Sequence, residues 1–325
     1  MDLSSDIFEV IKQDLALLEG ELLKAVASPV ELVQEIGTHL VQSGGKRLRP
    51  ALFLLAARSG KAFDSSRAMP LAAALELIHM ASLVHDDVID HADTRRGTPT
   101  ANSKWGNQIS VLSGDYIFAR AFALLAEHSY DSRITKRLAE LVCDLSAGEI
   151  IQNRGIYQAS RDIDAYYERI AKKTADFLEI CCETGAIIGK MNEKDIQGLA
   201  TYGHSIGMAF QITDDLLDIT SNEKKIGKPA GNDIRQGIVT LPVIRALDTS
   251  SDRGELAAII ENRSMEAVQI ERALNIVRAS DGIAFAQDRA DAFLEQAKQS
   301  LPEDLPQDIY DTYIQAADFI GRRDF

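Results

Sequence analysis

Two acidic stretches of the chain have the residue types and spacing that bind a divalent cation. They are Asp86-Asp87-Val88-Ile89-Asp90 and Asp214-Asp215-Leu216-Leu217-Asp218. In each, the outer aspartates are four residues apart and share one face of a helix, where like charges repel and need compensation. Carboxylate oxygens suit magnesium, which also binds phosphates. One such stretch is equally well explained as a solvated acidic face, but two predict opposed motifs that clamp a diphosphate through bridging metals.

Three short basic stretches are candidates for holding phosphate groups. Gly44-Gly45-Lys46-Arg47-Leu48-Arg49-Pro50 contains Lys46 and Arg49, three apart, after a glycine pair that permits close approach to an anion. Arg95-Arg96 follows the first acidic stretch and offers planar guanidinium groups for phosphate oxygens. Lys172-Lys173-Thr174 is the third. Each stretch alone is a common surface patch. Only in combination with the acidic stretches does the set indicate a phosphate-binding site.

A lysine-bearing segment follows the second acidic stretch. Residues 221–237 contain Lys224, Lys225 and Lys228 together with glycines and a proline, which predicts a long loop. Such a loop at the mouth of a cavity could close over phosphates and exclude water. The alternative is an ordinary solvated loop.

The elements that must position these residues are predicted to be helices. Apolar residues recur at helical spacing from Ile7 to Leu22, and no proline occurs between Pro99 and Pro229. A second break is expected from Leu301 to Pro306, before a short final helix. No run of alternating β-branched residues indicates a strand. We therefore predict an all-α fold in a single domain spanning residues 1–325.

Composition narrows the functional class. The net charge of -14 argues against nucleic acid and against an anionic membrane surface, because both require basic patches. Three cysteines, two of them adjacent, argue for reduced thiols rather than disulfides. We find no signal peptide and no uncharged apolar stretch of about 18 residues. The expectation is a cytoplasmic protein without a transmembrane segment.

The chain as a whole resembles the trans-isoprenyl (polyprenyl) diphosphate synthase family. The matching stretches lie in the family's order along most of the chain: residues 44–50, 77–79, 85–97, 173–174, 210–218 and 227–229. Within the family it looks closest to bacterial long-chain synthases such as the large subunit (component II) of heptaprenyl diphosphate synthase. The ending at residues 319–325 is also similar to that group.

The resemblance implies a fold and a reaction. The fold is an isoprenoid synthase-type bundle of long helices around a central cavity. The reaction is the magnesium-dependent, head-to-tail condensation of isopentenyl diphosphate with an allylic diphosphate, with Mn2+ as a possible substitute for Mg2+. The product is an all-trans polyprenyl diphosphate, and no nucleic acid takes part.

The resemblance also implies residue roles. The diphosphate of isopentenyl diphosphate is expected at Lys46, Arg49, His79 and Arg96. The metal ligands are expected to be Asp86, Asp90, Asp214 and Asp218, and the catalytic set also includes Asp87, Asp215 and Lys173. The allylic substrate is expected at Arg95, Lys173, Thr174, Gln211 and Lys228. One departure is Ile238, where short-chain members often carry a lysine, so no phosphate contact is assigned there.

Product length is expected to depend on the helical turn before the first acidic stretch. Ala81 and Ser82 lie about one turn, roughly 5 Å, deeper than Asp86, and Ile78 lies below them. Small residues here would let a product tunnel continue, although they also simply allow close helix packing. The resemblance implies a product longer than farnesyl diphosphate, of about six to eight isoprene units, about C30–C40.

Several other classes of protein share part of this pattern. A geranylgeranyl or medium-chain synthase would share all the motifs. A class I terpene cyclase would share the first acidic motif but lack the isopentenyl site, and a metal phosphohydrolase would not need two acidic motifs. A non-catalytic partner subunit would not need them intact. A homodimer and a heterodimer with a small regulatory subunit are both expected options.

Overall fold

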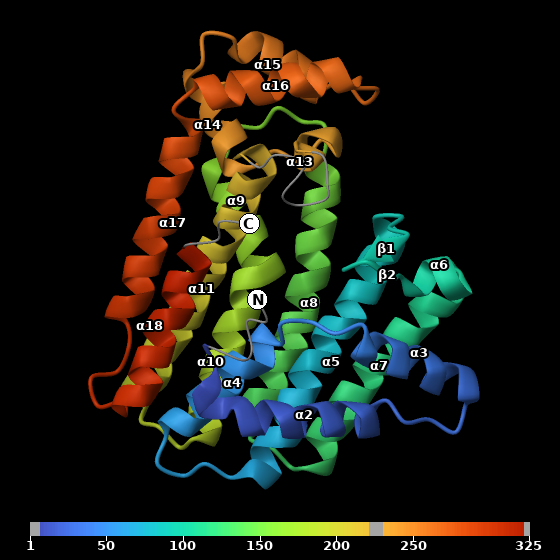
Figure 1. Cartoon of the computed structure of the whole chain (residues 1–325), viewed down its shortest axis with the longest axis vertical. Coiled ribbons are helices and arrows are strands. Elements are labelled where there is room, and N and C mark those ends of the chain that lie inside the picture. The colour runs from blue at the N-terminus through green and yellow to red at the C-terminus, as the bar shows by residue number, and fades with distance from the viewer. Residues whose placement is uncertain (1–6, 221–229, 322–325) are drawn as a thin grey trace. The chain divides into compact units, whose positions relative to one another are not determined.

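The structure is a computed structural model that describes residues 7–220 and 230–321, and these residues are helical almost throughout (Figure 1). The first half contains η1 Glu9–Ile11, α2 Lys12–Ala25, α3 Glu31–Gln42, α4 Leu48–Ser59, α5 Ser65–Ile89, α6 Ala101–Trp105, α7 Asn107–Glu127 and α8 Ser132–Gly155. The second half contains α9 Ile163–Ile170, η2 Ala171–Ala175, α10 Asp176–Ile188, α11 Glu193–Thr220, α13 Asn232–Arg235, α14 Leu241–Thr249, α15 Arg253–Ile260, α16 Ala267–Ala279, α17 Gly282–Gln299 and α18 Gln307–Gly321. The all-α prediction is confirmed.

In the described part of the chain, the only strands form a two-residue hairpin that the sequence did not indicate. Strand β1 (Thr94–Arg95) pairs antiparallel with β2 (Thr98–Pro99). The turn between them places Arg96 and Gly97 at φ values of 53° and 75°. Positive φ at both central residues suits a two-residue hairpin turn. This turn fixes the backbone from which Arg95 and Arg96 project.

The chain divides into two compact units. The first comprises residues 1–142, 180–200 and 302–312, and the second comprises residues 143–179, 201–301 and 313–325. The boundary follows tertiary packing and not the order of the sequence, so both units are discontinuous. The prediction of a single domain stays a prediction.

Helix α5 is the core of the first unit. Most of its residues from Ala68 to Ala81 are buried, and it packs most extensively against α7. Both α5 and α7 are long and apolar enough to cross a membrane when up to two charges are allowed, but 72% of the qualifying stretch of α5 is buried by protein. In α7 that share is 33%. Helix α5 is therefore a core helix, whereas α7 keeps apolar surface that residues 7–220 and 230–321 leave uncovered.

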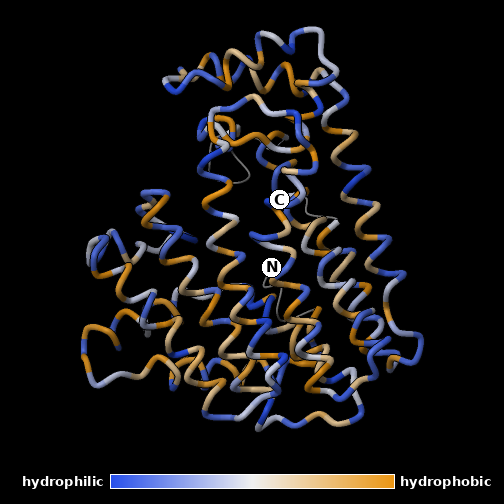
Figure 2. Tube along the Cα trace, turned by 180° about the vertical axis from the view of Figure 1, so that it is seen from behind, coloured by the Kyte–Doolittle hydropathy of each residue, from blue (hydrophilic) through white to orange (hydrophobic). Residues whose placement is uncertain are grey.

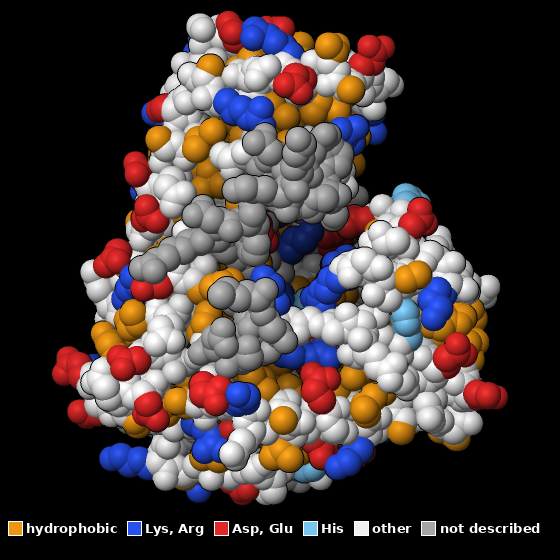
Figure 3. All heavy atoms as spheres, in the orientation of Figure 1, with side chains coloured by type: hydrophobic (Ala, Val, Ile, Leu, Met, Phe, Trp, Pro, Cys, Tyr) orange, Lys and Arg blue, Asp and Glu red, His pale blue; other side chains and the backbone are white. Residues whose placement is uncertain are grey.

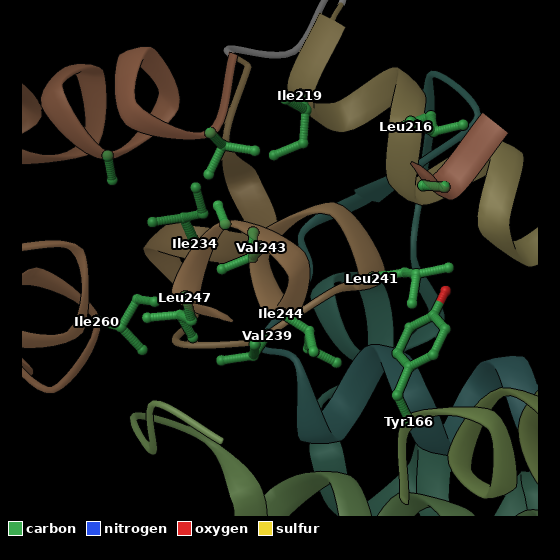
Figure 4. Close-up of a cluster of buried hydrophobic side chains, with 14 of the residues drawn as sticks. Tyr166, Leu216, Ile219, Ile234, Val239, Leu241, Val243, Ile244, Leu247 and Ile260 are labelled. Carbon is green, nitrogen blue, oxygen red and sulfur yellow. The ribbon is translucent and has the colours of Figure 1, made fainter. Parts of the chain in front are cut away.

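The second unit has its own hydrophobic core. Side chains from α9, α11, α14 and α16 meet in it, among them Tyr166, Leu216, Leu241 and Leu247 (Figure 4). Hydrophobic and hydrophilic residues alternate in short blocks along the helices, as amphipathic helices require (Figure 2). The core of the second unit thus supports the C-terminal end of α11, where the second acidic stretch lies.

The N-terminal helix and the two predicted breaks in the helical pattern differ in how well the structure matches them. The apolar stripe near the N-terminus forms η1 and α2, in which Ile11, Leu18 and Leu22 are fully buried, whereas Ile7 lies before η1 and, like Leu15, is half-buried. The break before the last helix is also confirmed, since α18 begins at Gln307. The loop predicted for residues 221–237 is wrong in its last part, where α13 forms. Lys224, Lys225 and Lys228 lie outside the described residues.

Candidate active site

The first acidic motif lies at the C-terminal end of α5. Asp86 is half-buried and Asp90, which caps the helix, is exposed. The central residue, Asp87, is only 5% exposed. Its Oδ1 accepts a hydrogen bond of 2.8 Å from Nε of Arg95. Burial raises the pKa of Asp87, while Arg95 opposes that rise by favouring the carboxylate.

The β1–β2 hairpin brings Arg96 against the glycine pair at residues 44–45. The guanidinium of Arg96 donates a hydrogen bond to the carbonyl oxygen of Gly44. A Cβ atom built on Gly45 would lie 2.4 Å from Nη1 of Arg96, so a side chain there would displace the arginine. The glycine pair therefore allows a close approach by an arginine.

The three cations of residues 46–49 lie in different environments. Lys46 is exposed, whereas Arg47 is buried in a left-handed conformation (φ 46°) at the start of α4. Arg47 donates to Glu19 at 2.7 Å and to Glu76 at 2.8 Å, so it serves the core. Arg49 is half-buried. The turn of the backbone at Arg47 thus separates a structural arginine from the two predicted phosphate-binding residues.

Arg49 and His79 form a close pair. Nη1 of Arg49 lies 3.1 Å from Nε2 of His79, which accepts the hydrogen bond because arginine can only donate. Burial and the nearby guanidinium groups lower the pKa of His79 well below its usual value. A cavity of about 50 Å³ beside this pair is lined by His79, Asp87, Arg95 and Arg96, among others. Its wall is largely apolar, and Arg47, Arg95 and Arg96 are the basic residues that contribute to it, beside Glu76 and Asp87.

The second acidic motif lies at the C-terminal end of α11. Asp214 and Asp218 are half-buried and Asp215 is 5% exposed. Asp215 accepts hydrogen bonds from Tyr166 Oη (2.8 Å) and Gln211 Nε2 (2.9 Å). Burial raises the pKa of Asp215 to about 6, against the effect of these two donors.

Asp218 and Asp233 form the end of the second acidic region. The carboxylate of Asp218 accepts the backbone N–H groups of Asn232 (3.0 Å) and Asp233 (3.1 Å), the first two residues of α13. Burial, together with the charges of Asp215 and Asp218, raises the pKa of Asp233 to about 8. A fourth carboxylate thus joins the three that the motif supplies.

Lys173 and Thr174 lie on η2, a π-helical turn between α9 and α10. Nζ of Lys173 lies 3.4 Å from Oε2 of Glu149 and 3.3 Å from Oε1 of Gln152, both on α8. Oγ1 of Thr174 donates to Oε1 of Gln211 at 3.1 Å. Single-turn π-helices occur frequently at functional sites. Here the turn joins the lysine to the second acidic region.

Comparisons with known proteins agree on one family. The family model for polyprenyl synthetase matches residues 30–277. Heptaprenyl diphosphate synthase component 2 of Geobacillus stearothermophilus is 39% identical over 320 residues, which cover 98% of each chain. The chain belongs to the polyprenyl synthetase family. It is therefore an enzyme, a prenyltransferase.

Solved structures of family members have the same fold. Heptaprenyl diphosphate synthase of Staphylococcus aureus superposes with a TM-score of 0.89 at 34% identity, covering 97% of this chain and 99% of that one. Polyprenyl synthase of Caulobacter crescentus CB15 superposes with a TM-score of 0.89 at 32% identity, covering 98% and 97%. The latter structure is a complex with calcium and isoprenyl diphosphate. These matches confirm the predicted fold class and agree with the metal dependence of the family.

The enzyme groups its predicted site residues within each unit. Arg49 contacts His79, and Asp87 contacts Arg95, in the first unit. In the second unit, hydrogen bonds join Thr174, Gln211 and Asp215. The expectation that the two acidic motifs oppose one another across a cavity stays a prediction. So do the roles assigned to these residues, and Lys228 lies outside the described chain.

Sequence reasoning missed four residues that contact the predicted site. Tyr166 and Asp233 each lie beside the second acidic motif, and Glu149 and Gln152 lie beside Lys173. Asp233 carries a sequence signal, since it follows Gly231-Asn232 shortly after an acidic motif. The other three lie on helices with no distinguishing pattern, so only tertiary structure reveals them.

The predicted chain-length residues are placed on the buried part of α5. Ile78 and Ala81 are fully buried, with no exposed surface. Ser82 is half-buried and its hydroxyl donates to the carbonyl oxygen of His79 at 2.9 Å. A larger side chain at residue 81 must therefore displace neighbouring atoms. The prediction that a product tunnel passes these residues stays open.

A third group with metal-ligating side chains lies in the second unit. Nδ1 of His204 lies 3.1 Å from Glu179 and 3.5 Å from Asp176. The approach of α11 to this segment is close, because a Cβ on Gly203 would lie 2.4 Å from the carbonyl oxygen of Leu178. The two carboxylates raise the pKa of His204 to about 9. The imidazole is thus protonated at neutral pH and forms an ion-paired cluster.

Proposed function

We propose that this prenyltransferase condenses isopentenyl diphosphate with an allylic diphosphate and releases an all-trans polyprenyl diphosphate of about C30–C40. The observation that supports this most directly is the repeated arrangement of the acidic motif. In both copies the central aspartate is buried and held by protein donors, while the outer two lie nearer the surface. Relatives named heptaprenyl and nonaprenyl diphosphate synthases support a long-chain product.

We assign the two substrates to different groups of residues. Lys46, Arg49, His79 and Arg96 bind the diphosphate of isopentenyl diphosphate in this proposal, because they gather cationic and neutral donors in the first unit. The allylic diphosphate is assigned to Arg95, Lys173, Thr174, Gln211 and Lys228. Arginine suits this task since its planar group donates two parallel hydrogen bonds to phosphate oxygens.

The carboxylates fit a magnesium site by donor chemistry. The outer residues Asp86, Asp90, Asp214 and Asp218 would hold Mg2+, or Mn2+ in its place, through oxygen ligands. The pKa of Asp233 is raised by burial and by two neighbouring carboxylates, which is consistent with a region that requires positive charge. When bound, the metal ions would supply positive charge that favours departure of the diphosphate from the allylic carbon.

The protein's own contribution is orientation and charge. In this proposal the basic residues fix and orient the two anionic substrates, and such positioning contributes about 7–11 kcal/mol in favourable cases. The carbon–oxygen bond of the allylic diphosphate breaks, and its electron pair leaves with the diphosphate. The alkene of isopentenyl diphosphate forms the new carbon–carbon bond with the allylic carbon, and the resulting cation loses a proton from an adjacent carbon to the departed diphosphate. No side-chain base is assigned. His85 is a structural residue in this proposal, because its Nε2 lies 3.1 Å from the carbonyl oxygen of Val111.

We propose that α7 contacts a second polypeptide chain. Val111 and Leu112 are 40% and 57% exposed, and two-thirds of the apolar stretch of the helix is not buried by its own chain. Contiguous exposed apolar surface commonly marks an interface. A homodimer and a heterodimer with a small subunit both satisfy this. We also place the enzyme in the cytoplasm, as one catalytic domain, in agreement with its reduced cysteines.

The test is an assay of the purified chain with labelled isopentenyl diphosphate, a series of allylic diphosphates, and Mg2+. Mass spectrometry of the products gives the chain length. Incorporation into products of about C30–C40 is expected. Phosphate release without incorporation would contradict the proposal, and a product no longer than C20 would correct the length. Activity that appears only after a small subunit is added would identify the heterodimer.

A further inference from the structure

Next to the second acidic motif, a buried tyrosine contacts the central carboxylate. Tyr166 on α9 is 3% exposed, and its hydroxyl donates to Oδ2 of Asp215 at 2.8 Å. Burying a hydroxyl or a carboxylate is costly unless it is hydrogen-bonded. Each of these two groups therefore depends on the other for its place in the fold.

The hydrogen bonding continues from Asp215 to the predicted substrate residues. Oδ1 of Asp215 accepts from Gln211 Nε2 at 2.9 Å, and Oε1 of Gln211 accepts from Thr174 at 3.1 Å. Four side chains from α9, α11 and η2 thus form one row. Because both carboxylate oxygens of Asp215 accept protein donors, this residue serves as an anchor, whereas Asp214 and Asp218 occupy the neighbouring positions of the same helical turn.

We propose that Tyr166 is a positioning residue for prenyl transfer. Acting through Asp215 and Gln211, it fixes Thr174 and the rotation of the α11 turn that carries Asp214 and Asp218. This inference rests on the proposed function of those residues in holding the allylic diphosphate. The physical reason is geometric: ligand groups must be held to within about 0.5 Å, which requires that their supporting residues be locked by packing and hydrogen bonds.

Disrupting this row of hydrogen-bonded side chains should impair the use of the allylic substrate only. The row consists of Tyr166, Asp215, Gln211 and Thr174, all in the second unit. The residues assigned to isopentenyl diphosphate belong to the first unit. Loss of the tyrosine hydroxyl should therefore weaken the use of the allylic substrate and leave the KM for isopentenyl diphosphate unchanged.

A purely structural role would produce a different pattern. The ring of Tyr166 belongs to the hydrophobic core of the second unit, as Figure 4 shows, and the guanidinium of Arg169 lies 5.4 Å from its centre. Tyr166→Phe keeps this ring and removes only the oxygen. Tyr167→Phe is the matched control, because Tyr167 is the next residue on the same helix and packs edge-on against Phe293.

The experiment compares wild type, Tyr166→Phe and Tyr167→Phe in steady-state kinetics with each substrate varied in turn. For Tyr166→Phe we expect kcat/KM for the allylic diphosphate to fall about 10- to 100-fold, as for other residues that support a ligand-binding group. The KM for isopentenyl diphosphate should stay within about twofold, and Tyr167→Phe should match wild type. Circular dichroism and the thermal midpoint report on folding.

A double-mutant cycle tests whether Tyr166 acts through Asp215. In an Asp215→Asn background, Tyr166→Phe should have little further effect, since coupled residues are not additive. Additive effects would overturn the proposed route. An unchanged Tyr166→Phe enzyme would show that the residue only fills space. Equal losses for both substrates, with a lowered thermal midpoint, would show a structural role.

A binding measurement separates this inference from the proposed reaction. Titration calorimetry with inorganic diphosphate and Mg2+ requires no turnover. Tyr166→Phe should weaken this binding about tenfold or more, and Tyr167→Phe should not. If wild type binds diphosphate but incorporates no isopentenyl diphosphate, the proposed function fails while the inference is still tested by the two variants. Equal binding by wild type and Tyr166→Phe would overturn the inference.

Discussion

The central aspartates of the two acidic motifs are equally buried, at 5% exposure each, but their partners differ. Asp87 is held by a cation, the guanidinium of Arg95, whereas Asp215 is held by two neutral donors, Tyr166 and Gln211. A buried carboxylate paired with a guanidinium leaves little net charge, while one paired with neutral donors remains negative. The central aspartate of the first motif is thus paired directly with a positive charge, whereas that of the second has neutral hydrogen-bond donors and feels the charge of Arg169 without a direct ion pair.

The surroundings of the two motifs extend this difference. Basic side chains from the β1–β2 hairpin and from α4 lie near the first motif. Asp233 lies near the second, where burial together with the charges of Asp215 and Asp218 raises its pKa to about 8 against the effect of Arg169 and Lys173. Charged side chains of both signs are otherwise interspersed on the face shown in Figure 3. We therefore expect the second region to depend more strongly on bound cations than the first.

The largest expected effect comes from the outer carboxylates. Asp86→Asn and Asp214→Asn should each lower kcat by about 10²- to 10³-fold, because each removes charge that would hold a metal ion against the leaving group. If the comparison is right, Asp214→Asn should raise the half-saturating concentration of Mg2+ more than Asp86→Asn. Asp93→Asn, an exposed neighbour of the first motif, is the control and should match wild type.

A bulky substitution before the first acidic motif should change the product length, and the equivalent substitution before the second motif should not. Ala81 and Ala209 each lie five residues before the first aspartate of a motif, and both are fully buried. Ala81→Phe should shorten the product by several isoprene units, since the larger side chain would block a tunnel below Asp86. Ala209→Phe should leave the length unchanged. Mass spectrometry of the products decides between them, and equal shortening by both would refute the tunnel.

Both changes overpack a buried position and should cost about 1–3 kcal/mol of stability. Thermal unfolding therefore accompanies the product analysis. A folded Ala81→Phe enzyme that still makes the wild-type product would contradict the prediction directly.

The cationic partner of Asp87 should matter for stability. Arg95→Ala leaves a buried carboxylate without its ion pair, which should lower the free energy of unfolding by about 1–3 kcal/mol, the upper value being reduced by the partial exposure of Arg95. Urea unfolding without metal measures it. Arg96→Ala removes a neighbouring, more exposed arginine and should cost less than about 1 kcal/mol. If the two variants lose equal stability, the ion pair between Arg95 and Asp87 does not contribute specifically to the free energy of unfolding.

The surplus charge of the second motif predicts a dependence on pH. The pKa of Asp233 is raised, so its contribution to stability is present below about pH 4 and is lost as the pH rises through about 8. Asp233→Asn should remove this loss and stabilise the metal-free protein at pH 8 by about 1–2 kcal/mol relative to wild type, with a smaller gain at pH 5. Added Mg2+ should reduce the difference. An Asp233→Asn variant that is less stable than wild type at pH 8 would contradict the inferred excess of negative charge around residue 233.

The smallest effect is expected at His204. Its pKa is raised to about 9, so the ion pairs with Asp176 and Glu179 contribute fully below about pH 6.5 and are lost as the pH rises through 9. Because the three side chains are about one-quarter to one-third exposed, the contribution should be less than about 1 kcal/mol. His204→Asn should flatten the fall in thermal midpoint between pH 7 and pH 10. If the thermal midpoint of His204→Asn falls as much as that of wild type, the pH dependence arises from other groups.

The sequence by itself determined the helical class and most of the chemistry. Spacing of apolar residues gave the long helices, and the outer aspartates share helix faces because the period of the helix places residues four apart on one side. The same local rules missed the β1–β2 hairpin, because two-residue strands leave no alternating pattern, and they missed α13 within the predicted loop.

Only the tertiary structure decided which partner each buried group has. Tyr166 precedes Asp215 by 49 residues, and Arg47 is 29 residues from Glu76. The spacing of Lys46 and Arg49 singled out Arg49, but only the structure shows that Arg47 is paired with Glu76 while Arg49 contacts His79. The cost of burying a charge depends on what surrounds it in three dimensions, so partners and pKa shifts cannot be obtained from residue types and spacing.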